Sequence, residues 1–223
     1  MRHTWTLLYA KVLSIALLVG ITGCATCHKK EPELPKTSLE VRQETLSNAC
    51  RITCGGASGS GVLASENIAI TANHVISDYS LGNEIGVEIP GEQISSGWEL
   101  VYFSYEYDIA IIRRPNSKGP GQVRWSGWSP SLTIGQRVFA SGYPWGVGPI
   151  LTTGYLSRIT DDDYFWISAN ALPGSSGSAI YSMDGKVIGI LVRGLVRGGQ
   201  WSQFTFHAVP VSLVSKQLSD AGI

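Results

Sequence analysis

The sequence predicts an all-β protein, and three features of it support this fold class. Only 15% of the residues are charged, against about 25% in an average soluble domain. Glycine accounts for 26 of the 223 residues, and 43% of the residues are hydrophobic. From residue 48 onward, short apolar runs alternate with turn residues such as Ser65-Glu66-Asn67 and Asp184-Gly185. About a dozen short strands at regular spacing indicate a barrel or sandwich, and the length fits one domain or two small barrels that share a cleft.

The strands and the one helix follow from these runs. Residues Pro210–Ala221 place Val211, Val214 and Leu218 on one helical face, with a proline near the start and Gly222 after the end, which predicts a C-terminal amphipathic helix. The expected strands are Cys50–Cys54, Gly61–Ala64, Ile68–Ala72, Ile85–Ile89, Trp98–Phe103, Asp108–Arg113, Gln122–Trp125, Gln136–Ser141, Leu151–Ile159, Tyr164–Ser168, Ser178–Tyr181, Lys186–Val192 and Phe204–Val209.

The charge balance excludes one class of partner. Seventeen basic residues match 17 acidic residues, so the formal net charge is zero. Binding of nucleic acid usually needs clustered cations and a basic isoelectric point. We therefore expect no nucleic-acid partner.

The first 23 residues are expected to be an export signal. Three basic residues precede the apolar run Val12–Ile21, which is too short to span a bilayer but suits a signal peptide. The run ends in Ile21-Thr22-Gly23-Cys24, which resembles the bacterial lipobox. That resemblance implies lipidation of Cys24 and a membrane-anchored lipoprotein of the cell envelope or periplasm. Cleavage near Ala25, or an uncleaved anchor, is the alternative.

Residues 24–45 are expected to form an extended, solvated tether, because residues 28–45 are polar, contain two prolines and show no apolar period. If Cys24 is lipidated, Cys27, Cys50 and Cys54 are left, an odd number. In an extended strand Cys50 and Cys54 would lie ~13 Å apart, too far for a disulfide, so they pair only if the chain turns between them. A zinc site is not expected, since no second close pair of cysteines or histidines accompanies them.

Three segments contain candidate catalytic residues. His74 follows the apolar run Ile68–Ala72, and a rigid strand end is a good place for a general base. Asp108 is the first residue of a nearly all-apolar strand, where a partly buried carboxylate needs a partner. Ser176 lies between Gly174 and Gly177 in a turn whose backbone N–H groups can point at a ligand. Each feature alone is commonly structural, and the turn Gly56-Ala57-Ser58-Gly59-Ser60 has the same outline as the Ser176 turn.

The order His74, Asp108, Ser176, each within its motif, resembles the trypsin-like serine proteases. An α/β-hydrolase would need the order Ser, Asp, His and a Gly-x-Ser-x-Gly motif. The resemblance covers about residues 48–220 and is closest to the Deg (HtrA-type) branch. The matching segments are Gly59–Leu63, Gly142–Gly146, Pro173–Ala179, Asp184–Ile190 and Ala208–Val211.

The resemblance implies two six-stranded antiparallel β-barrels, at about residues 46–118 and 119–209, with the C-terminal helix at residues 210–221 after them. It makes Ser176 the nucleophile, His74 the general base and Asp108 the group that orients His74. The N–H groups of Gly174 and Ser176 would form the oxyanion hole, without a metal or organic cofactor. The implied activity is hydrolysis of peptide bonds in unfolded or exported proteins. A catalytically inactive binding module and an esterase on the same fold are the alternatives.

The resemblance also implies a primary specificity pocket. Its floor would be Asn170, which carries no charge to select Arg or Lys, and its walls would include Ala171, Leu191 and His207. Because the walls are mainly aliphatic, we expect cleavage after Val, Ala, Ile or Leu. A protonated His207 facing the pocket would instead attract Glu, although strand alternation can point it away.

Two departures from relatives add further expectations. Ser175 is neutral where zymogen-activated relatives carry an aspartate, so that activation switch is not expected. The sequence ends 13 residues after Pro210, so a PDZ domain of the Deg type is not expected.

Overall fold

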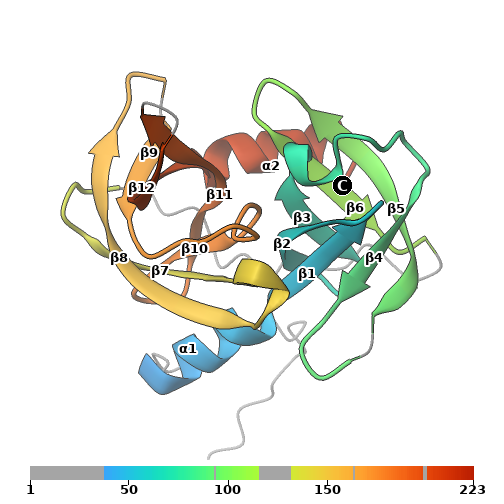
Figure 1. The fold of residues 1–223 in the computed structure, drawn as a ribbon, viewed down its shortest axis with the longest axis horizontal. Helices are drawn as coiled ribbons and strands as arrows, with labels where there is room; N and C mark the ends of the chain where they lie inside the picture. The colour runs from blue at the N-terminus through green and yellow to red at the C-terminus, as the bar shows by residue number, and fades with distance from the viewer. Residues whose placement is uncertain (1–37, 93, 116–131, 163, 198–199) are drawn as a thin grey trace, which may run out of the picture. The chain divides into compact units, whose positions relative to one another are not determined.

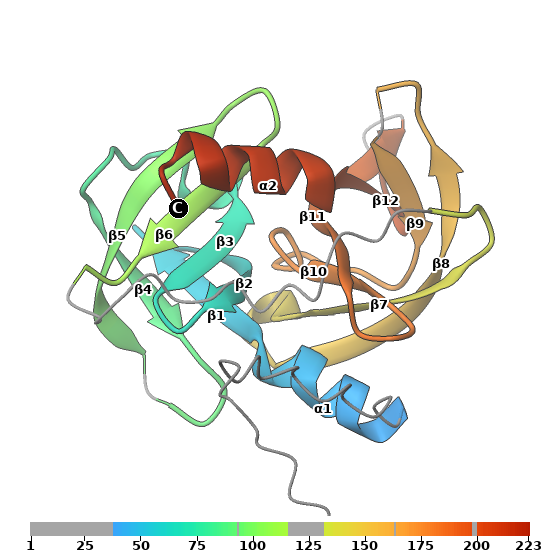
Figure 2. The same ribbon diagram turned by 180° about the vertical axis from the view of Figure 1, so that it is seen from behind.

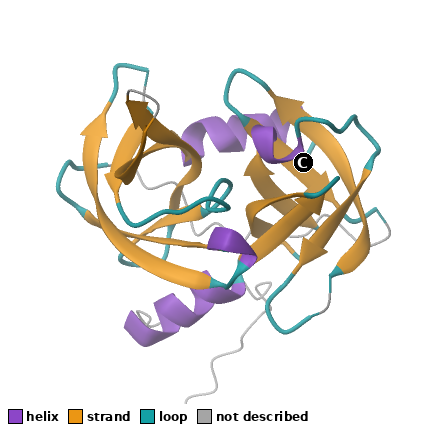
Figure 3. Ribbon diagram, in the orientation of Figure 1, coloured by secondary structure: helices purple, strands orange, loops and turns teal. Residues whose placement is uncertain are grey.

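The computed structural model describes residues 38–92, 94–115, 132–162, 164–197 and 200–223. Within these ranges the chain is mostly β-strand, arranged as two closed six-stranded barrels followed by a C-terminal helix (Figures 1 and 3). The predicted fold class is confirmed. The expected signal peptide, Cys24, Cys27 and the expected strand Gln122–Trp125 lie outside the described residues.

Both barrels have the same strand order. The first closes in the order β1-β2-β3-β6-β5-β4, and the second in the order β7-β8-β9-β12-β11-β10, with antiparallel neighbours throughout. The first barrel comprises β1 (Ala49–Cys54), β2 (Ala57–Ser65), β3 (Ile68–Ala72), β4 (Glu84–Glu88), β5 (Ser95–Ser104) and β6 (Ile109–Arg113). The second comprises β7 (Arg137–Gly142), β8 (Ile150–Ile159), β9 (Phe165–Ser168), β10 (Ala179–Ser182), β11 (Val187–Arg197) and β12 (Gln200–Pro210).

Strand β2 begins four residues before the predicted Gly61, because the first hairpin is tighter than the sequence suggests. Gly55 and Gly56 form its two-residue turn with φ values of 53° and 92°, the left-handed conformation that such turns need. Cys54 therefore pairs directly with Ala57, and the Gly/Ser-rich stretch that resembles a loop is part of the strand. The β11–β12 hairpin is likewise longer than predicted.

The expectation of an extended tether is wrong for residues 38–45. Residues Ser38–Ser47 form helix α1, which packs on β1, β7 and β8. Val41 is buried, and the Ser141 hydroxyl donates a hydrogen bond to the Thr45 carbonyl at 2.8 Å. The side chain of Arg42 lies over the ring of Phe139. The segment has low helical amphipathicity, so its sequence does not predict a helix. These tertiary contacts stabilise the helix instead.

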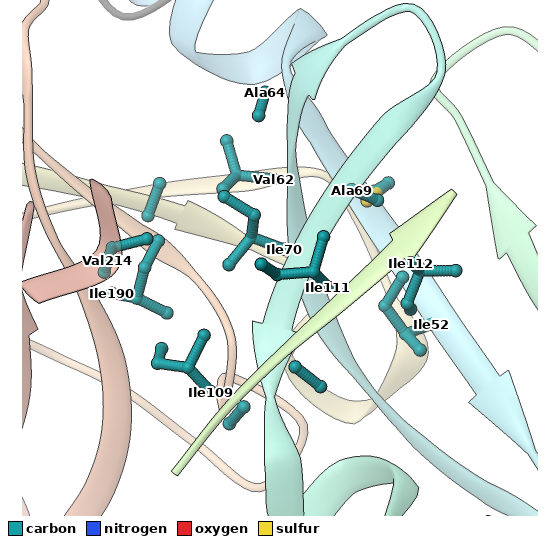
Figure 4. Close-up of a cluster of buried hydrophobic side chains, with 14 of the residues drawn as sticks. Ile52, Val62, Ala64, Ala69, Ile70, Ile109, Ile111, Ile112, Ile190 and Val214 are labelled. Atoms are coloured by element: carbon teal, nitrogen blue, oxygen red, sulfur yellow. The ribbon is translucent and has the colours of Figure 1, made fainter. Parts of the chain in front are cut away.

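The core continues from the first barrel to the second. All five residues of β3 are buried, because one face of this strand lines the first barrel and the other faces the second. Figure 4 shows Ile70 and Ile109 on the side of Ile190 and Val214, while Ile112 lies on the opposite side. Helix α2 (Val211–Asp220) follows β12 and crosses to the first barrel (Figure 2).

The two described cysteines are structural. Cys50 and Cys54 both lie on the extended strand β1, buried and unpaired, as the spacing argument requires. Burial raises the pKa of both thiols, so neither is a reactive thiolate. Among the described residues, no helix is both long enough and apolar enough to cross a bilayer.

Candidate active site

His74 lies in a short 3-10 turn (Asn73–Ile76) directly after β3, rather than at the strand end itself. The residues on either side of it, Asn73 and Val75, are buried, which fixes the turn against the barrel. The imidazole remains 47% exposed. The turn therefore presents one side chain to solvent from a rigid base.

Asp108 holds His74 from the adjacent strand. Ala72 pairs with Ile109 in the β3–β6 ladder, so the residues just beyond this pair face each other. Asp108 Oδ1 accepts the His74 backbone N–H at 2.9 Å, and Oδ2 lies 2.8 Å from His74 Nδ1. The Asp108 carbonyl accepts the Asn73 N–H at 2.9 Å. A carboxylate can only accept, so Nδ1 carries the proton of this hydrogen bond; in the neutral tautomer, Nε2 is then the nitrogen without a proton.

Asp108 has a left-handed backbone conformation, with φ of 53°. This conformation is uncommon for a residue with a side chain and carries a strain cost. The three hydrogen bonds to Asn73 and His74 hold Asp108 in it, and its side chain is only 15% exposed. The prediction that this carboxylate is partly buried and has a partner is confirmed.

Ser176 lies in a loop that contacts both barrels. The Ser176 carbonyl accepts the N–H of Ser60 on β2 at 2.8 Å, and the Gly177 N–H donates to the Leu191 carbonyl on β11 at 2.7 Å. Gly174 and Gly177 have φ values of 92° and 90°, which a glycine adopts without steric cost. The loop is thus fixed by one barrel on each side.

Two backbone donors of this loop are free. Within the described part of the chain, neither the Gly174 N–H nor the Ser176 N–H donates to a protein acceptor. The Pro173 carbonyl accepts the Trp145 N–H at 2.7 Å. Because a trans peptide is planar, the Gly174 N–H points away from Trp145. A pair of free N–H groups beside a serine suits stabilisation of an oxyanion.

The turn that carries His74 and the loop that carries Ser176 meet at Gly59. A Cβ atom at Gly59 would lie 2.6 Å from the Val75 side chain and 3.2 Å from the Ser176 carbonyl oxygen. The structure therefore brings all three residues of the expected triad to one region. The Ser176 hydroxyl makes no hydrogen bond within the described ranges; such catalytic contacts often tighten only when substrate binds.

The expected pocket residues divide between two cavities. Asn170, Ala171 and Leu191 line a cavity of about 10 Å³ behind the Ser176 loop, roughly the space of one water molecule. His207 instead lines a larger cavity of about 440 Å³ together with Asp108. Asn170 is exposed at the surface, whereas Ala171 and Leu191 are buried.

His207 is stacked on Tyr164, with ring centroids 4.8 Å apart. Burial lowers the pKa of His207 from its ordinary value of 6.5, the Arg193 charge lowers it further, and Asp162 partly opposes both effects. Burial also raises the pKa of Tyr164 to about 12. His207 is consequently a neutral imidazole at pH 7, and the stack is uncharged.

A metal site does not emerge from the described ranges, where no three His, Cys, Asp or Glu side chains gather closely enough to hold an ion. The expectation that no cofactor is needed stays a prediction.

Sequence reasoning missed two residues that contact the Ser176 loop. Trp145, in the short turn Pro144–Gly146, binds the Pro173 carbonyl through its N–H. Ser60 belongs to the stretch whose outline resembles the Ser176 turn, and it lies on β2 directly against that turn. A Gly/Ser-rich outline does not distinguish a catalytic loop from the strand against which the loop packs.

The fold is trypsin-like. Its two barrels share one strand order, the first carries a His–Asp pair, and the second carries a Gly-x-Ser-Gly loop. The family model of the trypsin-like peptidase domain matches residues 59–190. The chain belongs to this family.

Curated relatives agree with this assignment, and a solved structure agrees with the fold. The chain is 31% identical over 176 residues to a probable periplasmic serine endoprotease, DegP-like, of Halomonas elongata, covering 74% of this chain and 35% of the relative. It is 28% identical over 224 residues to the periplasmic pH-dependent serine endoprotease DegQ of Escherichia coli, covering 95% and 47%. The crystal structure of a serine endoprotease from Yersinia pestis superposes with a TM-score of 0.69 at 22% identity, covering 85% of this chain and 68% of that one. The chain thus spans less than half the length of these two curated relatives.

Proposed function

We propose that this protein is a serine endopeptidase that cleaves peptide bonds through Ser176, His74 and Asp108. The observation that carries the proposal is the double acceptance by Asp108, which takes both the backbone N–H and the Nδ1–H of His74. A general base needs a fixed ring and a free Nε2 lone pair, and this arrangement supplies both. Membership of the trypsin-like peptidase family supports the same function.

In the proposed mechanism, Ser176 Oγ attacks the scissile carbonyl carbon while His74 Nε2 takes the hydroxyl proton. Asp108 stabilises the imidazolium that forms, and His74 then gives the proton to the leaving amine. The carbonyl oxygen becomes negatively charged and receives the free N–H groups of Gly174 and Ser176. Water repeats the sequence on the acyl-enzyme and releases the second product.

Labelling with a fluorophosphonate tests the proposal. The reagent phosphonylates an activated serine, so wild type should be labelled at Ser176, Ser176→Ala should not, and unfolded casein should be cut only by wild type. Mass spectrometry of the labelled peptide identifies the serine. An absence of labelling in folded wild type would favour a binding module, and labelling without casein cleavage would favour an esterase.

We propose that the substrate residue before the cut is small and apolar. Asn170 carries no charge to select Arg or Lys, and the buried residues beside it, Ala171 and Leu191, are aliphatic. Aliphatic walls favour Val, Ala, Ile or Leu at this position. Selection of Glu by His207 is not favoured, since that ring is neutral at pH 7 and lies in the other cavity.

Profiling with a peptide library measures this preference. We expect at least tenfold higher kcat/KM for substrates with Val or Ala before the cut than for matched substrates with Arg, because an uncompensated charge is costly to bury. Dominant cleavage after Arg or Lys contradicts the pocket assignment, and dominant cleavage after Glu transfers specificity to His207.

We also propose that the protein is exported and anchored through a lipid on Cys24. Two periplasmic relatives support export, and the Ile21–Cys24 sequence, outside the described residues, supports the anchor. Mass spectrometry of the mature N-terminus in a bacterial host distinguishes an acylated Cys24 from an unmodified residue elsewhere.

A further inference from the structure

The hydroxyl of Ser60 is completely enclosed where the two barrels meet. Ser60 lies on β2 of the first barrel with no exposed surface. Its Oγ lies 2.7 Å from the Gly174 carbonyl oxygen and 2.8 Å from the Tyr143 backbone nitrogen. Both partners belong to the second half of the chain, one in the Ser176 loop and one just after β7. A single side chain therefore links the barrel that carries His74 to the loop that carries the nucleophile.

The direction of these two hydrogen bonds is forced. The Tyr143 N–H can only donate, so the Ser60 oxygen accepts from it, and the one hydroxyl hydrogen is left for the Gly174 carbonyl. A hydroxyl that accepts and donates at once is polarised, which strengthens both bonds. Without that hydrogen, the half-buried Gly174 carbonyl would lose its hydrogen-bond partner in the protein.

The two peptide groups that flank Gly174 are consequently both held. The Pro173 carbonyl is bound by the Trp145 N–H at 2.7 Å, which directs the Gly174 N–H away from Trp145. The Gly174 carbonyl is bound by Ser60 Oγ. A rotation that turned the Gly174 N–H away from the substrate would strain or break these bonds. The free N–H beside Ser176 is therefore held in place before substrate arrives.

We propose that Ser60 is a positioning residue: its hydroxyl holds the Gly174 carbonyl, and this bond, together with the bond from Trp145 to the Pro173 carbonyl, fixes the Gly174 backbone so that the Gly174 N–H is directed at the developing oxyanion. This inference rests on the proposed endopeptidase function. Ser60 touches neither the substrate nor the reacting atoms; it acts through Gly174. The backbone of Ser60 contributes separately, through the 2.8 Å hydrogen bond from its N–H to the Ser176 carbonyl, and substitution of the side chain leaves that bond possible.

The test compares Ser60→Ala with Ser65→Ala. Ser65 is a matched control because it lies on the same strand, is 3% exposed, and donates its hydroxyl to Asn67 Oδ1 at 2.7 Å, away from the Ser176 loop. Each variant removes one buried, hydrogen-bonded hydroxyl from β2. The measurements are kcat and KM on a peptide substrate, the inhibition constant of a peptidyl trifluoromethyl ketone, which forms an oxyanion on the enzyme, and the thermal midpoint.

We expect Ser60→Ala to lower kcat by about 10²-fold, the loss typical of one oxyanion donor, with KM changed less than about threefold. Binding of the ketone should weaken in parallel with kcat. Ser65→Ala should keep kcat within about threefold of wild type, even if it lowers the thermal midpoint as much as Ser60→Ala does. A folded Ser60→Ala with kcat within threefold of wild type overturns the proposal, as does a loss that both variants share.

Two further comparisons keep the test decisive. If Ser60→Ala does not fold, Ser60→Cys retains a weaker donor at the position and should lose at least tenfold in kcat; a folded Cys variant with unchanged kcat overturns the proposal. Fluorophosphonate labelling of wild type separates the two ideas. Wild type that labels at Ser176 while Ser60→Ala stays fully active removes only the role of Ser60, whereas wild type that does not label removes the function itself.

Discussion

Replacing His74 with alanine should lower kcat by roughly 10⁶-fold, the loss seen when a triad serine protease is deprived of its base. Without the imidazole, no group is left to take the Ser176 proton. The fold should be retained, because the His74 side chain is 47% exposed and its neighbours hold the turn. Hydrolysis of a peptide substrate, with circular dichroism as the check on folding, measures the effect. Activity within tenfold of wild type contradicts the triad.

Asp108→Asn extends the same prediction to the third residue. An Asn side chain can still accept the His74 backbone N–H, but its NH₂ group then faces Nδ1 and favours the ring tautomer with the proton on Nε2. That tautomer cannot take a proton from serine, so kcat should fall by about 10⁴-fold. Asp184→Asn is the control, since Asp184 is a largely exposed turn residue paired with Lys186, and it should leave kcat unchanged. Equal activity of the two variants contradicts the role of Asp108.

Gly177→Ala should destabilise the fold strongly. Gly177 has φ of 90°, and a Cβ atom there would lie 2.0 Å from the Ser60 carbonyl oxygen and 2.5 Å from Thr71 Oγ1. The loop must shift, which breaks its bonds to Ser60 and Leu191. Backbone strain and overpacking together should remove about 3 kcal/mol from the free energy of unfolding, a large part of the stability of an ordinary domain. Urea unfolding measures it.

Gly56→Ala is the matched control for this prediction. Gly56 has φ of 92°, almost the value of Gly177, but nothing lies within 4 Å of its added Cβ atom. It should lose only the cost of a left-handed alanine, about 1 kcal/mol. The difference between the two losses in free energy of unfolding therefore measures the contribution of the close contact between the loop and Ser60. Equal losses of stability would show that the approach is unimportant.

The sequence predicts an element well when residues within that element determine it, and poorly when contacts with distant parts of the chain determine it. Strand β3 has the predicted bounds, Ile68–Ala72, because a short apolar run between turn residues is a local signal. Helix α1 has no such signal; it forms because Val41 and Thr45 find partners on the second barrel. Ser60 looks like a loop residue until strand pairing places it in β2.

The candidate site divides in the same way. The sequence predicts His74, Asp108 and Ser176 as the triad because each occurs in a motif, and the motifs occur in an order that matches one family. The position of His207 was not predictable, since it depends on which face of β12 meets Tyr164. The hydrogen bond from the Ser60 hydroxyl to the Gly174 carbonyl was not predictable either, because the two residues are far apart in sequence and meet only when the barrels pack together.

Because the proposed site is divided between two barrels, its activity depends on the position of one barrel relative to the other. His74 and Asp108 are hydrogen-bonded to each other within the first barrel, whereas Ser176 belongs to a loop of the second barrel that is hydrogen-bonded to β2 of the first. A small shift of one barrel against the other would leave the hydrogen bonds within each sheet intact, but it would move Ser176 away from His74. If the proposed triad is the catalytic site, mild denaturant should lower peptide hydrolysis before it reduces the β-sheet signal, because local shifts between packed segments open at a lower free energy than global unfolding.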